Sequence, residues 1–138
     1  MKKTKLKTYL NVFIKVILVF VITAIGFYII ICCSIAGSVN SISREAIGEY
    51  GLNRIDSLIA YVDSNEHSLR KRNSAVWALG QIGDKHAISI LKKYYASGRC
   101  CHNTNLCQHE LKKALDGCAG KFNATAWMRN INYFSNIK

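Results

Sequence analysis

The stretch WALGQIGDKHAISILKK, from Trp77 to Lys93, has a helical pattern on both sides of two glycines. Gly80 lacks a Cβ and is expected to allow close packing. Alanine there gains helix propensity, whereas a β-branched side chain is disfavoured in a left-handed residue, so valine at Gly83 should cost more than alanine at Gly80. Gly83 is expected to end the first helix in the left-handed conformation, and Asp84 to cap the next helix. The flanking stripes have helical spacing: Ala75, Ala78, Leu79 and Ile82, then Ala87, Ile88, Leu91, Tyr94 and Tyr95. The stretch predicts two antiparallel helices joined by a tight turn.

The pattern occurs twice. AIGEYGLNRIDSLI (Ala46–Ile59) aligns with ALGQIGDKHAISIL (Ala78–Leu91) at an offset of 32 residues, and Gly48 and Gly51 fall on the later glycine pair. A third, weaker copy is expected from Leu106 to the end. One such unit cannot bury its apolar face alone, so about three are needed. The aromatic side chains are interpreted as packing between units: Tyr61, Trp77, Tyr94, Tyr95, Trp127 and Phe134. The sequence therefore predicts an all-α fold, a short α-solenoid of about three helical hairpins.

RKRNSAVWALGQIGDKHAISIL resembles a short HEAT repeat of the phycobilisome-lyase HEAT-like group. The matching positions are Arg72, Ala75, Ala78, Leu79, Gly80, Ile82, Gly83, Asp84, Ala87 and Leu91. The match is specific for Leu69–Tyr95 and weaker for Arg44–Val62. The third unit lacks G-x-x-G-D, and the usual proline between the helices is missing. The resemblance implies a surface that binds another protein or peptide. The alternative that it implies is an enzyme-accessory or lyase-like factor that handles a chromophore or another ligand.

An apolar segment precedes the repeats. No charged residue occurs between Lys15 and Arg44, and the run Val16–Ile35 is apolar on all faces. About 20 such residues, each rising about 1.5 Å, cross the roughly 30 Å hydrocarbon layer. The predicted parts are a basic tail (1–15), a transmembrane helix (16–37) and a repeat domain (38–138). The alternative is a signal peptide, residues 1–36, cleaved after Ser34-Ile35-Ala36, which would leave a secreted repeat domain.

The chain is basic, with 19 Lys+Arg against 8 Asp+Glu and a net charge of +11. Five lysines fall in the first fifteen residues: Lys2, Lys3, Lys5, Lys7 and Lys15. The positive-inside rule therefore places the N-terminus in the cytoplasm and residues 38–138 outside it, in the periplasm or at the cell surface if the source is bacterial. The positive charge favours an acidic protein or peptide partner. Arg70-Lys71-Arg72 lacks an aromatic platform and is interpreted as a solvated face, so nucleic acid is not expected.

Four cysteines cluster in the predicted third unit: Cys100, Cys101, Cys107 and Cys118. A domain outside the cytoplasm permits disulfides, and a bond from Cys107 to Cys100 or Cys101 is expected. Cys107 and Cys118 lie eleven residues apart on one predicted helix, which is too far for a bond between them. The alternatives are a zinc site using Cys100, Cys101, Cys107 and His109, with His102 nearby, or neither.

The sequence contains no recognisable catalytic motif. G-x-S-x-G and C-x-x-C are both absent, and His67 and His86 are expected to be solvated at helix starts. We therefore expect no catalytic residues, no cofactor and no enzyme activity. The combined prediction is a membrane-anchored repeat module that serves as a protein-interaction scaffold.

Overall fold

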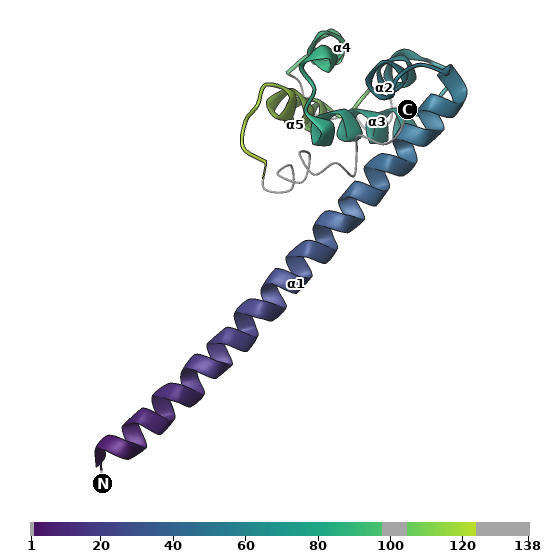
Figure 1. The fold of residues 1–138 in the computed structure, drawn as a ribbon. Helices are drawn as coiled ribbons and strands as arrows, with labels where there is room; N and C mark the ends of the chain where they lie inside the picture. The colour runs from purple at the N-terminus through teal and green to yellow at the C-terminus, as the bar shows by residue number, and fades with distance from the viewer. Residues whose placement is uncertain (1, 98–104, 124–138) are drawn as a thin grey trace. The chain divides into compact units, whose positions relative to one another are not determined.

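The protein's computed structural model describes residues 2–97 and 105–123, and in these ranges it is helical without strands (Figure 1). The elements are α1 (Lys2–Tyr50), α2 (Arg54–Asp63), α3 (Leu69–Ile82), the 3-10 helix η1 (Lys85–Ala87), α4 (Ile88–Tyr94) and α5 (Gln108–Cys118). The chain divides into two compact units, Met1–Ile35 and Ala36–Lys138. We call Ala36–Lys138 the repeat unit. The expected all-α class is confirmed for the described residues, whereas Trp127 and Phe134 of the predicted closing stripe lie outside them.

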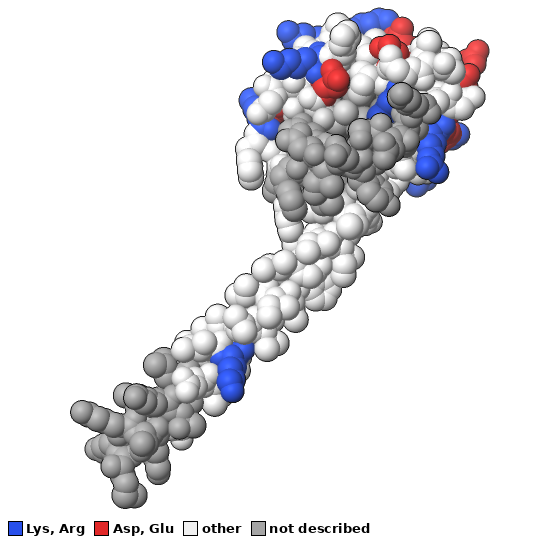
Figure 2. Space-filling model, viewed as in Figure 1, with Lys and Arg blue, Asp and Glu red and all other residues white. Residues whose placement is uncertain are grey.

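Helix α1 contains the apolar segment. Its most apolar 18-residue window, within Asn11–Tyr50, has a mean hydropathy of 3.0. The large apolar side chains between Val16 and Ile31 are mostly exposed. Figure 2 shows most of the described charged side chains on the second compact unit and a blue basic group on α1. By length and composition α1 can cross a membrane, and a signal sequence near the N-terminus meets the same criterion.

Short polar side chains start the helices of the repeat unit. Asn53 accepts a hydrogen bond from the Asp56 backbone N–H, which caps α2, and Ser68 accepts one from the Lys71 N–H to cap α3. The Asp84 carboxylate accepts from the His86 N–H at 2.8 Å. Asp84 thus caps the second helix of its hairpin, as predicted, and that helix begins as the single turn η1 before continuing as α4.

Left-handed glycines follow helices α1 and α3, the first helices of the two aligned hairpins. Gly51 has φ 63° and Gly83 has φ 68°, and each donates its N–H at 2.8 Å to the carbonyl four residues earlier. The two turns therefore have the same glycine conformation and the same backbone hydrogen bond, at the offset of 32 residues predicted from the sequence. Gly120, with φ 84°, ends α5 in the same conformation, and Lys121 N–H bonds to Asp116 O in the 6→1 pattern of a Schellman motif.

The first glycine of each pair has a different role. A Cβ on Gly80 would lie 2.6 Å from the Ala114 Cα, and one on Gly117 would lie 2.5 Å from the Gly80 carbonyl oxygen. Helices α3 and α5 therefore meet backbone to backbone, and the predicted close packing at Gly80 is confirmed. A Cβ on Gly48 would meet nothing within 4 Å, so Gly48, the corresponding glycine of the first hairpin, makes no such close helix contact. Because α5 occupies the space that a Cβ would need at Gly80, alanine there is expected to destabilise the contact, and the ranking against valine at Gly83 stays a prediction.

One cation is buried in the core. Arg72 is 7% exposed, its Nε donates to the Val62 carbonyl at 2.8 Å, and its terminal nitrogen donates to Asn65 Oδ1 at 3.1 Å. The guanidinium also lies 5.3 Å from the Tyr94 ring centroid. The interpretation of residues 70–72 as one solvated face is therefore wrong for Arg72. Its side chain satisfies a carbonyl at the C-terminus of α2, which no helical N–H can reach.

Candidate interaction groove and polar cluster

A groove runs between helices α3 and α5. Its two stretches, about 470 and 550 Å³ in volume, share Trp77 and Glu110 as lining residues. The α3 side is formed by Arg70, Asn73, Ser74, Trp77 and Gln81, and the α5 side by Glu110, Lys113, Ala114 and Gly117. Both sets have the i, i+3, i+4, i+7 spacing of one helix face. Two facing helix stripes therefore build the groove, which we call the α3–α5 groove.

The floor of the α3–α5 groove is lined by small residues, whereas large aromatic side chains lie at its wall and rim. The floor is low because Gly80, Ala114 and Gly117 carry little or no side chain. Trp77 stands half-buried at one wall, and Phe122, which is 95% exposed, lies at the rim. Exposed aromatic side chains beside a hollow are typical anchors of protein interfaces. Trp77 therefore belongs to this surface and does not serve purely as packing between units.

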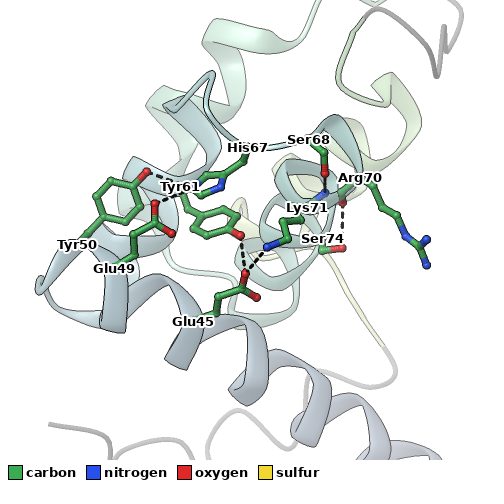
Figure 3. Close-up of polar contacts among 9 residues, drawn as sticks. All are labelled: Glu45, Glu49, Tyr50, Tyr61, His67, Ser68, Arg70, Lys71 and Ser74. Carbon is green, nitrogen blue, oxygen red and sulfur yellow. Dashed lines mark hydrogen bonds and ion pairs between the residues drawn. The ribbon is translucent and has the colours of Figure 1, made fainter.

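The charges of the α3–α5 groove are unevenly compensated. Lys113 Nζ forms an ion pair with a Glu110 carboxylate oxygen at 3.5 Å, and the Lys113 side chain is 62% exposed. Among the described residues, no carboxylate lies within ion-pair distance of Arg70, which is exposed at the same groove. In Figure 3 the Arg70 side chain points away from the neighbouring polar residues. The groove thus has one uncompensated positive charge.

A second feature is a polar cluster at the end of α1 (Figure 3). Glu45 on α1 accepts hydrogen bonds from the Tyr61 hydroxyl and from Lys71 Nζ, both at 2.8 Å. The Lys71 hydrogen bond, followed by that from Tyr61, lowers the pKa of Glu45 below its ordinary value. Burial and the Glu45 contact raise the pKa of the Tyr61 phenol. The cluster therefore ties α1 to both α2 and α3.

His67 belongs to the same cluster. Its ring stacks on the Tyr61 ring, with centroids 3.7 Å apart, and its Nε2 lies 3.1 Å from a Glu49 carboxylate oxygen and 3.3 Å from the Tyr50 hydroxyl. The side chain is 11% exposed, so the expectation of a solvated His67 is wrong. His86 is exposed, as expected. No sequence pattern around His67 indicates this position, because its partners come from α1 and α2.

The Glu45 contact predicts a small pH-dependent stability. Because the folded pKa is lowered, the contribution of Glu45 is present above its unfolded pKa and is lost as the pH falls through the folded value. Glu45 is 49% exposed, so Glu45→Gln should lower the free energy of unfolding at pH 7 by at most about 1 kcal/mol. The difference between the two proteins should vanish in acid, measured by urea unfolding at several pH values. Glu66→Gln, which changes an exposed carboxylate outside the cluster, should show no such trend; an equal trend would contradict the assignment.

The cysteine predictions are partly outside the described residues, because Cys100, Cys101 and His102 lie there. Cys107 and Cys118 are buried at opposite ends of α5, and no disulfide joins any two of the described cysteines. The Cys107 N–H donates to Asn73 Oδ1, and the Cys118 thiol lies 3.6 Å from the Leu79 carbonyl oxygen. Over residues 2–97 and 105–123, no three His, Cys, Asp or Glu side chains are grouped for a metal, and His109 is part of no such group. The expected disulfide thus has no support from the described cysteines, which pack into the helical core.

Comparison with known proteins gives one likeness. Residues 71–97 match the PBS lyase HEAT-like repeat. This segment contains most of α3, the Gly83 turn, η1 and α4, so the match covers the second hairpin. No curated protein and no solved structure matches the chain. The chain therefore contains a HEAT-like repeat, which suggests a protein-interaction or scaffolding role.

Proposed function

We propose that the protein is a membrane-anchored HEAT-like repeat module that binds another protein and has no catalytic activity of its own. The observation that carries the proposal is the α3–α5 groove, with half-buried Trp77 on one wall and exposed Phe122 at the rim. Repeat domains of this kind present extended surfaces to their partners. Glu45 and Glu49, the acidic groups of the polar cluster, are already engaged by neighbouring side chains, which fits a structural role.

The proposed anchor is helix α1 with its apolar stretch Val16–Ile35. The signal-peptide alternative requires cleavage at Ser34-Ile35-Ala36, which lies inside the continuous helix α1. Ala36 is 7% exposed, and Val39 and Ala46 farther along α1 are also buried. Cleavage after Ala36 would remove a buried side chain from the second compact unit, which fits a retained helix. The lysines before the apolar stretch favour an N-terminus in the cytoplasm and a repeat unit outside it.

The groove proposal is tested by site-specific photo-cross-linking of the full chain in its native membrane. A photoreactive residue replaces Lys113, which lines the groove, or Lys85, an exposed lysine of η1 that does not. We expect one protein to be cross-linked in near-stoichiometric amount from position 113 and little from position 85. Equal labelling from both positions, or none from 113, would contradict the proposal. A coloured or small ligand that co-purifies in place of a protein would favour the accessory-factor alternative.

The orientation has its own test. A reporter that is active only outside the cytoplasm, fused after Lys138, should be active, because the lysine-rich end of α1 is expected to stay inside. Activity of a cytoplasm-only reporter at the same position would reverse the proposed topology and leave the groove proposal unaffected.

A further inference from the structure

We infer that the segment bound in the α3–α5 groove is an extended acidic peptide, with a carboxylate against Arg70 and an apolar side chain against Trp77. The inference rests on the proposed function and adds the chemistry of the partner. Arg70 and Trp77 line the same stretch of the groove. They supply the two kinds of contact that such a peptide needs, one charged and one apolar.

The charge argument starts from the carboxylates. The chain has eight acidic residues, and all of them fall within the described ranges. Four are in ion pairs with lysines, Glu45, Asp63, Glu110 and Asp116, and Glu49 lies 3.1 Å from His67 Nε2. Glu110, the carboxylate among the described lining residues, is held by Lys113. Arg70 is therefore the cation of the groove that lacks a described carboxylate, and its planar guanidinium binds a carboxylate through two parallel hydrogen bonds.

The spacing of the two anchors specifies the peptide further. Arg70 and Trp77 are seven residues apart on α3, a rise of roughly 10 Å along the helix axis. An extended peptide rises about 3.3 Å per residue, so three residues span the same distance. The expected segment therefore carries Asp or Glu three positions from a large apolar or aromatic residue. A single uncompensated cation is too little for a nucleic-acid backbone, whose binding uses many phosphate contacts.

The first test measures binding of fluorescently labelled ten-residue peptides to the full chain in detergent micelles, by anisotropy. One peptide has Glu and Phe three positions apart, and its isostere has Gln in place of Glu. We expect the acidic peptide to bind at least tenfold more tightly than the isostere. Arg70→Gln should remove that difference, and Trp77→Ala should weaken both peptides. Lys85→Gln removes the same charge from an exposed site off the groove and should change binding less than twofold.

A charge swap tests the pairing directly. Arg70→Glu should lose the acidic peptide and gain affinity for the same peptide with Lys in place of Glu. Circular dichroism should confirm that the variant stays folded, as expected for an exposed residue.

Several outcomes would overturn the inference. If the isostere binds as tightly as the acidic peptide, or if Lys85→Gln weakens binding as much as Arg70→Gln, the Arg70–carboxylate contact is not specific. If no peptide binds while position 113 still cross-links a protein, the groove binds a partner of other chemistry, and the proposed function stands without the inference. Failure of both peptide binding and cross-linking would contradict the two together.

Discussion

Gly117→Ala is expected to destabilise the repeat unit by roughly 2–3 kcal/mol, the upper part of the range of about 1–3 kcal/mol for overpacking in a closely packed contact. The added Cβ would lie 2.5 Å from the Gly80 carbonyl oxygen, and a backbone atom cannot rotate away as a side chain can. Alanine gains up to about 1 kcal/mol of helix propensity, which offsets only part of this cost. Thermal unfolding, followed by circular dichroism in detergent, should show a fall in Tm of about 4–8 °C for each kcal/mol lost.

Gly48→Ala is the matched control. Gly48 is also helical, but a Cβ there would meet nothing within 4 Å, so the variant should be unchanged or up to about 1 kcal/mol more stable. Gly80→Ala should resemble Gly117→Ala, because its Cβ would lie 2.6 Å from the Ala114 Cα. A similar Tm for Gly117→Ala and Gly48→Ala would show that α3 and α5 do not meet at the glycines.

Arg72→Met is expected to lower the free energy of unfolding by roughly 2–3 kcal/mol. Methionine fills similar space but leaves the Val62 carbonyl without its donor and removes the bond to Asn65. A buried acceptor without a partner costs about 1–3 kcal/mol, and the lost cation–π contact with Tyr94 adds to it. Urea unfolding of the two proteins measures the difference.

Arg70→Met is the control for Arg72→Met. It removes the same side chain two residues earlier, from an exposed position, so stability should change by less than about 0.5 kcal/mol. Equal losses in the two variants would contradict the assignment of Arg72 to the core. Arg70→Met would in addition be expected to affect partner binding, which is measured separately.

The turn chemistry was predictable because its causes are local. A left-handed residue after a helix favours glycine, and a carboxylate just before a helix caps it, so Gly83 and Asp84 could be assigned from their neighbours. The same reasoning missed the third glycine pair. Gly117 and Gly120 lack the aspartate that completes G-x-x-G-D, yet Gly120 has the expected φ of 84°. The glycine spacing alone would have been a better signal than the full motif.

The candidate site could not be predicted, because its residues meet only through tertiary packing. The lining stripe Arg70, Asn73, Ser74 and Trp77 is mostly polar, and such a stripe is usually interpreted as a solvated helix face. Arg72 and His67 were misassigned for the same reason. Val62 lies on α2 and Glu49 on α1, away from Arg72 and His67 in the sequence, and no pattern around either residue indicates these partners. Burial of a polar side chain becomes favourable only where distant segments supply its hydrogen bonds.

The continuity of α1 has a consequence for release of the repeat unit from its proposed membrane tether. The helix that carries the apolar stretch also provides Val39, Ser43 and Ala46, which are buried in the repeat unit, and Glu45 and Glu49 of the polar cluster. A sheddase that cut between Ala36 and Tyr50 would remove part of the first hairpin along with the tether. The liberated fragment would lose core side chains and unfold more readily than the parent. Proteolytic cleavage in that stretch is therefore expected to destabilise the repeat unit.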